Sequence, residues 1–206
     1  TSFDIGSEAD TLEPGKPGFK KFRNGELTLS IDKNTRSLKL DEACEKAGEK
    51  AKDVERIFLE GDNFDFEVKA SGQKDLYLEL NSDANKKVIV ANQEAKMTFF
   101  NFPGKPEFDF TGVAKFAVED PDKSYYFYEI VDDKPVKTSA KYNKEDDSFE
   151  LRTRTLGSYV ISDKELAASD ATTDKPSTDK PADKPAEEKP VTPTTPGKNV
   201  PTGAIA

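Results

Sequence analysis

The chain has 206 residues and carries 31 Lys or Arg against 40 Asp or Glu, so its formal net charge is −9. This length allows one ordinary domain with room for a linker or a tail. The absence of His excludes Ser/His/Asp and Cys/His catalysis and His-ligated zinc, the single Cys excludes an intrachain disulfide, and the acidic balance argues against nucleic-acid binding.

The aromatic residues and most prolines occupy different parts of the chain. All 6 Tyr and 14 Phe lie at or before Tyr159, whereas 7 of the 13 Pro lie after it. Aromatic side chains supply apolar area for a core, and a Pro-rich segment that lacks them cannot bury enough to fold. We therefore predict a β-rich domain over residues 1–165 and a disordered Pro/Thr/Lys-rich stalk over residues 166–206.

The first third of the chain predicts one strand followed by one helix. Leu27, Leu29 and Ile31 alternate with polar residues, which is the two-residue period of a half-buried strand. Residues 41–59 begin with acids, are rich in Ala, Glu and Lys, and repeat apolar residues at three- and four-residue spacing, so they predict one amphipathic helix that Gly61 helps to end.

The remainder of the body alternates again and predicts a series of strands. They are separated by turn-forming clusters rich in Asp, Asn, Pro and Gly. The predicted strands span residues 64–68, 76–80, 87–92, 96–102, 113–119, 124–131, 136–142, 149–155 and 158–163. The predicted fold class is therefore mainly β: an antiparallel β-sandwich-like domain with one inserted helix at about 41–59.

The second part has the composition of an extended spacer. Its first four prolines, from Pro176 to Pro190, each follow a Lys that is itself preceded by an acid. Proline removes backbone donors and restricts the residue before it, so this repeat favours polyproline II. An interdomain linker would have the same composition.

The end of the stalk gives it a more specific interpretation. The Pro-rich repeats run into KNVPTGA, and the combination resembles the wall-spanning region and sorting signal of Gram-positive surface proteins. In that family a sortase cuts between Thr and Gly of an LPxTG-like pentapeptide and joins the Thr to peptidoglycan. The matching residues are Thr202 and Gly203, although Pro201 directly precedes Thr202 here. The resemblance implies attachment to peptidoglycan through Thr202, with an apolar segment expected after Ala206 in the precursor.

Two stretches of the body are similar to proteins of the same kind. Residues 97–112 and 152–166 resemble parts of the β domains of uncharacterised sortase-anchored surface proteins from Gram-positive gut Clostridia. The resemblance implies that residues 1–165 form an extracellular domain at the cell wall of a Gram-positive bacterium. It implies no particular biochemical activity.

The aromatic run at residues 125–128 is the best candidate for a contact surface. In a strand, Tyr125 and Phe127 share one face while Tyr126 and Tyr128 share the other, so both faces are apolar. Either the outer face lies under a helix or a long loop, or Tyr125 and Phe127 form an exposed patch that binds a sugar or a protein.

Other patterns leave alternatives open. The acidic turns near Asp62, Asp120, Asp132 and Glu145 suit calcium less well than backbone hydrogen bonding, because none has the EF-hand pattern. Cys44 is expected to be a buried thiol. Wall-anchored β domains can also carry Lys–Asn isopeptide links, but the Lys and Asn residues are too numerous to select a pair.

These observations favour a non-enzymatic, wall-anchored module for adhesion or ligand binding, displayed on a polyproline stalk. Its partner would be a host or microbial glycan or protein. We predict no catalytic residues, metal, cofactor or nucleic-acid partner, and no membrane span because no apolar run reaches 18 residues. One alternative is a spacer that lifts a partner domain from the wall. A second is a small glycoside hydrolase that uses two carboxylates.

Overall fold

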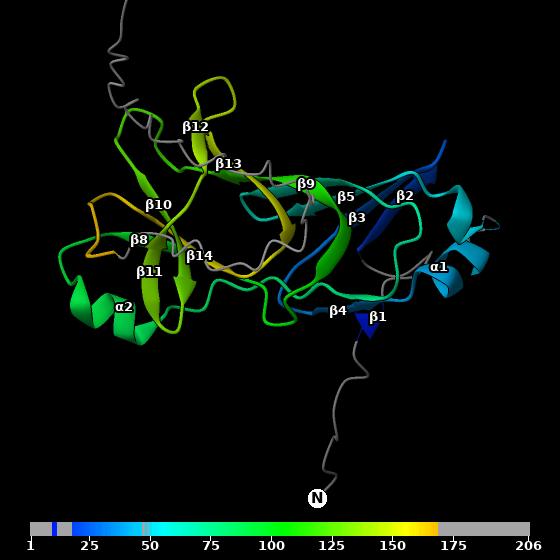
Figure 1. The fold of residues 1–206 in the computed structure, drawn as a ribbon, viewed down its shortest axis with the longest axis horizontal. Helices are drawn as coiled ribbons and strands as arrows, with labels where there is room; N and C mark the ends of the chain where they lie inside the picture. Colours follow the sequence, from blue (N-terminus) through cyan, green and yellow to red (C-terminus); the bar gives the residue numbers. More distant parts are fainter. Residues whose placement is uncertain (1–9, 12–17, 47, 49, 169–206) are drawn as a thin grey trace, which may run out of the picture. The chain divides into compact units, whose positions relative to one another are not determined.

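The described part of the chain is mainly β. The computed structural model describes residues 10–11, 18–46, 48 and 50–168, and within them the strands form three sheets (Figure 1). The largest sheet has seven strands in the order β12-β13-β9-β6-β5-β3-β2. Their bounds are β2 Phe19–Arg23, β3 Glu26–Ser30, β5 Arg56–Gly61, β6 Phe64–Lys69, β9 Glu107–Ala117, β12 Lys141–Asn143 and β13 Ser148–Thr155.

Two smaller sheets complete the β structure. A four-stranded sheet has the order β11-β10-β14-β8, with β8 Met97–Asn101, β10 Tyr126–Val131, β11 Lys134–Lys137 and β14 Ser158–Ser162. A three-stranded sheet has the order β1-β4-β7, with β1 Asp10–Thr11, β4 Thr35–Leu38 and β7 Leu76–Tyr77. The helical elements are α1 Leu40–Lys46, a 3₁₀ turn at Ala51–Asp53, and α2 Lys86–Ala91.

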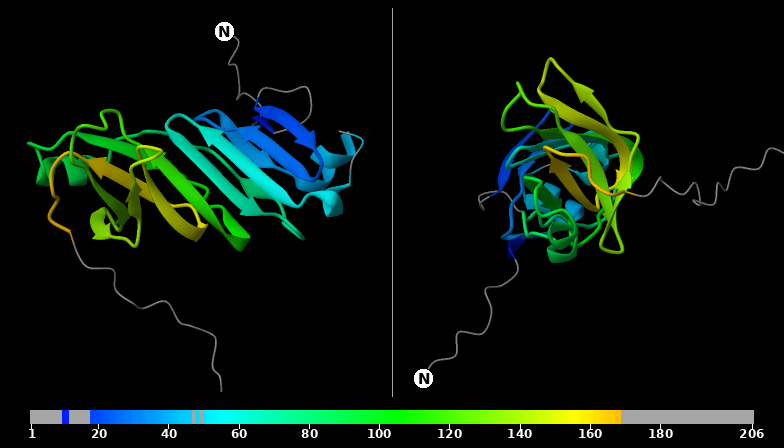
Figure 2. Two further views of the ribbon diagram at one scale, coloured as in Figure 1. Left: turned by 90° about the horizontal axis from the view of Figure 1, so that it is seen from above. Right: turned by 90° about the vertical axis from the view of Figure 1, so that its left-hand side faces the viewer.

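The two-residue alternation of the sequence places one face of the seven-stranded sheet in the core. Along β6, Phe64, Phe66 and Val68 are buried while Asp65 and Glu67 are exposed. The strands of this sheet lie side by side in the left view of Figure 2, from blue β2 and β3 through cyan β5 and β6 to β9 and β13. The sheet therefore has an inner, apolar face and an outer, charged face.

Aromatic contacts join the four-stranded sheet to this inner face. The Phe116 ring of β9 lies 5.2 Å from Phe100 of β8, 4.8 Å from Phe127 of β10 and 5.0 Å from Tyr159 of β14, measured between ring centroids. The three-stranded sheet contributes Leu38 and Leu76 to the same hydrophobic cluster. Both smaller sheets thus cover the inner face, whereas the outer side chains of β6 are exposed among the described residues.

The predicted helix at 41–59 is wrong beyond its first two turns. Helix α1 ends at Lys46, and Gly48 has φ +75°, a conformation that suits glycine at a helix end. Residues 56–61 instead form β5, because Ile57 and Leu59 are buried at alternating positions and the strand pairs with β3 and β6. Gly61, predicted to end the helix, ends β5.

The connection from β3 to β5, which passes through α1, makes the seven-stranded sheet mixed rather than purely antiparallel. It returns the chain beside β3 in the same direction, so β3 and β5 are parallel, as are β1 and β4. The sheets are otherwise antiparallel. The predicted purely antiparallel arrangement is corrected to a mixed one.

Three predicted strands also differ from the structure. Residues 87–92 fall in α2, because the Asn85 side chain accepts hydrogen bonds from the backbone of Lys87 and Val88 at 3.1 Å each and so caps a helix. The strand predicted at 76–80 is only Leu76–Tyr77, and the strand at 136–142 is divided between β11 and β12. The other predicted strands are present with shifted ends.

Candidate functional site

A shallow groove lies on the outer face of the seven-stranded sheet. We call it the open-face groove. Its volume is about 580 Å³, and it crosses four neighbouring strands, β3, β5, β6 and β9. Its lining comprises Glu26, Thr28, Phe58, Leu59, Glu60, Asp65, Phe66, Glu67, Val113 and Lys115. A groove with an aromatic ring and several carboxylates is the strongest candidate site among the described residues.

Phe58 gives this groove its largest apolar surface. Its neighbours on β5, Ile57 and Leu59, point into the core, so the strand directs Phe58 to the opposite face, where it is half-buried. Within the described part of the chain, Phe58 belongs to neither hydrophobic cluster. The ring is therefore available to a ligand in the groove.

Asp65 is a carboxylate whose ionised form the fold disfavours, although the charges of Lys115 and Lys20 partly oppose this effect. It lies on β6 opposite Glu60 of β5 and opposite Lys115 of β9. Among the described residues it makes neither a hydrogen bond nor an ion pair, whereas Glu60 pairs with Lys20 and Glu67 pairs with Arg56. Desolvation, followed by the charge of Glu60, raises the pKa of Asp65 above its usual value of 3.8.

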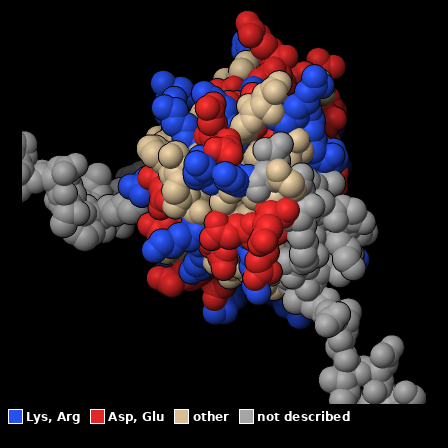
Figure 3. Space-filling model, turned by 90° about the vertical axis from the view of Figure 1, so that its right-hand side faces the viewer, with Lys and Arg blue, Asp and Glu red and all other residues tan. Residues whose placement is uncertain are grey.

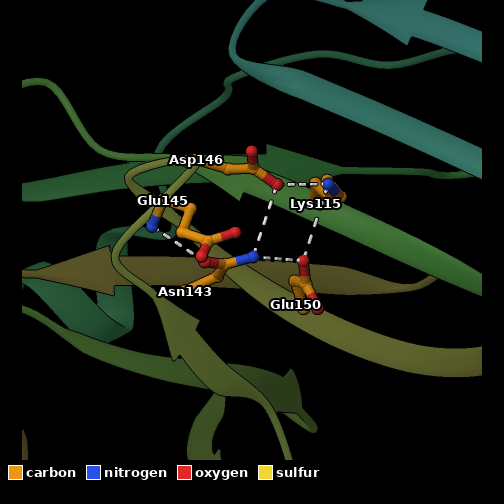
Figure 4. Close-up of polar contacts among 5 residues, drawn as sticks. All are labelled: Lys115, Asn143, Glu145, Asp146 and Glu150. Atoms are coloured by element: carbon orange, nitrogen blue, oxygen red, sulfur yellow. Dashed lines mark hydrogen bonds and ion pairs between the residues drawn. The ribbon is translucent and has the colours of Figure 1, made fainter.

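Lys115, at the edge of the groove, belongs to a polar cluster that joins β9, β12 and β13 (Figure 4). Its ammonium pairs with Asp146 and lies 3.5 Å from Oε1 of Glu150. Nδ2 of Asn143 donates to the same Glu150 oxygen at 2.9 Å and to Oδ2 of Asp146 at 3.4 Å. The cluster therefore fixes the turn between β12 and β13 against β9.

This cluster brings together the residue types of an isopeptide link but keeps the amine charged. The hydrogen bond to Asp146 is the main cause that raises the pKa of Lys115, and its side chain is 39% exposed. Attack on the Asn143 amide would require a neutral lysine, which burial away from acids favours. Lys115, Asn143 and Glu150 are therefore better described as an ion-pair network.

Glu60 and Asp65 are the pair of carboxylates that a hydrolase would use here. They are direct cross-strand neighbours, whose Cβ atoms lie about 5 Å apart in antiparallel sheets. A raised pKa, as Asp65 has, is a property of the general acid in retaining glycosidases. The strand register thus places two carboxylate side chains next to each other in the groove.

The predicted contact residues lie elsewhere. Phe127 is 8% exposed and its ring centroid lies 5.4 Å from that of Phe149, so it belongs to the core. Tyr125 is half-buried and packs against the same cluster. The predicted exposed patch of Tyr125 and Phe127 is therefore corrected: strand β10 turns Phe127 inward, and its neighbour Tyr126 is the exposed aromatic residue.

The face of β10 that carries Tyr128 is covered, which agrees with one of the two alternatives given for the aromatic run at residues 125–128. Tyr128 lies in a second cluster with Val88 of α2, Phe99 and Val160, and its hydroxyl accepts a hydrogen bond from the backbone of Leu166 at 3.0 Å. The cover is α2 and the segment after β14, rather than the helix predicted at 41–59.

The remaining predicted features are divided between described and undescribed residues. Pro201, Thr202 and Gly203 lie outside the described residues, as does the stalk from residue 169. Cys44 is 1% exposed, which confirms a buried thiol. In the described ranges no three acidic or Cys side chains group closely enough to hold a metal ion, and the predicted acidic-turn residues Asp120 and Asp133 pair with lysines.

Acidic and basic side chains are interspersed on the face shown in Figure 3, the right-hand side in Figure 1. None of the helices in the described ranges has the length and apolar character needed to cross a membrane.

Phe58 was not singled out from the sequence, and Asp65 was considered only as part of the acidic turn near Asp62 that was weighed as a source of calcium ligands. From the sequence, Phe58 was placed in a helix. The apolar run of Ile57, Phe58 and Leu59 could have identified it as an outward-facing aromatic residue, because the middle residue of three in a strand faces away from its two neighbours. Nothing in the sequence distinguishes Asp65 from the other acids. No protein-family model, curated protein or solved structure matches this chain.

Proposed function

We propose that the chain is a non-enzymatic binding module displayed at a bacterial cell wall and that the open-face groove is its ligand site. The observation that carries the binding proposal is the combination of Phe58, outside both hydrophobic clusters, with Asp65, a carboxylate without a direct ion-pair partner among the described residues whose pKa is raised by desolvation. Both features oppose stability in the free protein, since an apolar ring meets water and a charge is partly desolvated. A ligand that covers the ring and pairs with the charge removes both penalties.

The arrangement of sheets supports this location. We interpret the seven-stranded sheet and the two smaller sheets as a β-sandwich-like domain, whose covered face is structural and whose open face is presented to partners. The Pro-rich stalk and the PTG sequence at residues 201–203 support secretion, sortase attachment to peptidoglycan at Thr202, and display on the surface of a Gram-positive bacterium.

A binding screen tests the proposal directly. The full chain is applied to arrays of glycans and extracellular-matrix proteins, beside the variants Phe58→Ala and Phe110→Ala. Phe110 is the matched control, because it is a 40% exposed Phe on β9 that does not line the groove. We expect Phe58→Ala to weaken the strongest interaction about tenfold or more, as for a buried interface aromatic, and Phe110→Ala to leave it unchanged. Equal loss in both variants, or no binding to any component, would reject the groove as the site and favour the spacer.

The cross-strand carboxylates support a second candidate, a glycoside hydrolase. In this candidate Asp65 is the general acid, because its pKa is raised, and Glu60 is the nucleophile. Incubation of the full chain with cell-wall and host polysaccharides, followed by measurement of released reducing ends, tests it. If the native chain releases reducing ends, and Glu60→Gln and Asp65→Asn each abolish that release, the hydrolase replaces the binding module as the proposed function.

A further inference from the structure

The charged side chains around the open-face groove compensate one another locally. Glu26 of β3 lies in register between Arg23 of β2 and Arg56 of β5. Asp65 of β6 lies opposite Lys115 of β9. A ligand with a net charge of either sign would therefore lie beside like charges as well as opposite ones. The strand register favours an uncharged ligand.

The other two acids of the groove are held in place by direct ion pairs. Glu60 accepts from Lys20 through Oε2, and Glu67 accepts from Arg56 through Oε1. A carboxylate has two oxygens and about four lone-pair sites, so each acid can accept further hydrogen bonds. Ammonium and guanidinium groups likewise carry several N–H donors. The groove thus offers positioned, charge-assisted acceptors and donors to a ligand that brings no charge of its own.

Phe58 supplies an apolar surface in the middle of these polar groups. In the strand register it lies between Thr28 of β3 and Glu67 of β6, and Val113 of β9 lies on the far side of Glu67. All four side chains line the groove. The row therefore contains a hydroxyl, an aromatic ring, a carboxylate and an aliphatic side chain, which suits a ligand with an apolar face and a polar rim.

The sheet geometry narrows the class of ligand further. The four strands pair with one another through their backbones, so this face presents side chains, and an extended polypeptide cannot join the sheet here as it would at an edge. The groove volume of about 580 Å³ lies within the range of about 300–1,000 Å³ that is typical of sites for small ligands. A sugar ring meets these requirements, because its C–H groups pack on the negative face of an aromatic ring while its hydroxyls donate and accept.

We propose that the open-face groove binds a neutral hexopyranose unit of a glycan, which packs on Phe58. The inference rests on the proposed function and names the ligand class of that site. Glu67 is the direct cross-strand neighbour of Phe58 and Asp65 is a diagonal one, at about 5 Å and about 7 Å, so one sugar can reach both carboxylates with its hydroxyls. A hydroxyl gives Asp65 the hydrogen bond that it lacks among the described residues and adds no charge.

A titration with simple sugars tests this assignment. The full chain is titrated with the methyl β-glycosides of glucose, galactose and N-acetylglucosamine, and its amide resonances are followed by NMR. At least one should give saturable shifts on β3, β5 and β6, with a Kd on the order of 1 mM, as for a single sugar unit. The uronic acid and the amino sugar that correspond to the bound glycoside should each bind at least about fivefold more weakly, because each meets like charges.

Substitutions and salt locate the contact. Phe58→Ala should weaken binding about tenfold or more, Phe58→Tyr should retain it because the ring is kept, and Phe110→Ala should leave it unchanged. Asp65→Asn should weaken binding about fivefold, because a charge-assisted hydrogen bond becomes a neutral one, whereas Asp122→Asn in an exposed turn should not. Salt at about 1 M should change the Kd of the neutral sugar less than about twofold, since no ion pair forms.

The outcomes separate this inference from the proposed function. The inference is overturned if none of the three glycosides binds in a Phe58-dependent manner, if the uronic acid or the amino sugar binds as tightly as the neutral sugar, or if salt abolishes binding. In each of these cases, a protein or a charged glycan that binds through Phe58 leaves the groove as a ligand site. If no sugar and no array component binds in a Phe58-dependent manner, both proposals fail.

Discussion

Asp65 is the residue on which the assignment of the open-face groove as a ligand site most depends. It is flanked by Glu60 on one side and by a lysine engaged with other acids on the opposite side. Acids with a perturbed pKa that lie in a groove are candidates for functional residues, because such shifts cluster at functional sites.

Asp65→Asn should stabilise the free protein at neutral pH. The pKa of Asp65 is raised in the folded state relative to 3.8, so folding disfavours the ionised form, and Asn removes that penalty. The gain should decrease as the pH falls through the raised pKa and vanish below about 3.8, where the unfolded chain is protonated as well. Urea unfolding at pH 7 and pH 3 measures it. Asp122→Asn controls for the loss of one negative charge, and an Asp65→Asn variant less stable than the native chain at pH 7 would contradict the account.

The Lys115 cluster makes a chemical prediction at the same scale. Because Asp146 holds the ammonium in its charged form, no amide bond should form between Lys115 and Asn143. The intact mass of the purified chain should equal the mass calculated from its sequence. A mass about 17 Da lower than calculated would indicate loss of ammonia and therefore a crosslink. If the Lys115→Met variant then had its own calculated mass, the crosslink would be assigned to Lys115 and the charge argument would be wrong.

Helix α2 is the element that covers the side of the four-stranded sheet facing away from the main core. Its Val88 packs on Tyr128 and Phe99, and Asn85 fixes its start by capping two backbone amides and by donating to Asp133 in the hairpin between β10 and β11. Without this helix, Tyr128 of β10 would lose part of its cover, whereas Phe127 would stay in the main core.

Replacement of the cap should therefore loosen this cover. Asn85→Ala is expected to lower the free energy of unfolding by about 1 kcal/mol, the usual effect of losing a helix N-cap, while Asn85→Ser should retain most of it because its hydroxyl oxygen can still accept. Urea denaturation compares the two variants, and hydrogen exchange at Val88 and Ile89 reports the local effect. Equal destabilisation by Ala and Ser would mean that the contact with Asp133, not the cap, holds the helix.

The elements differ in how far the sequence predicts them. Alternation was sufficient for β3, β6, β9 and β13, because each has one buried and one exposed face. It failed at β5, where Phe58 adds an apolar residue on the open face and the preceding Ala/Glu/Lys composition imitates a longer helix. The same residue that misled the secondary-structure prediction is the one that marks the groove.

For the whole molecule, the segregation of aromatics from prolines predicts a folded body, and the three sheets of the described residues bear out its mainly β class. The site was not predictable in the same way. The groove is formed by residues from Glu26 to Lys115 that come together only through the strand order β9-β6-β5-β3 and its parallel pair, and no local pattern encodes that order. The aromatic run at 125–128 is conspicuous in the sequence because Phe127 belongs to one hydrophobic cluster and Tyr128 to the other.

The location of ligand protection on the full chain tests the central claim most directly. Hydrogen–deuterium exchange is measured with and without the array component that binds most tightly. The account predicts slower exchange concentrated in β3, β5, β6 and β9, and loss of this protection in Phe58→Ala. Protection concentrated instead on β10, β14 or α2, with the strands of the open-face groove unchanged, would contradict it.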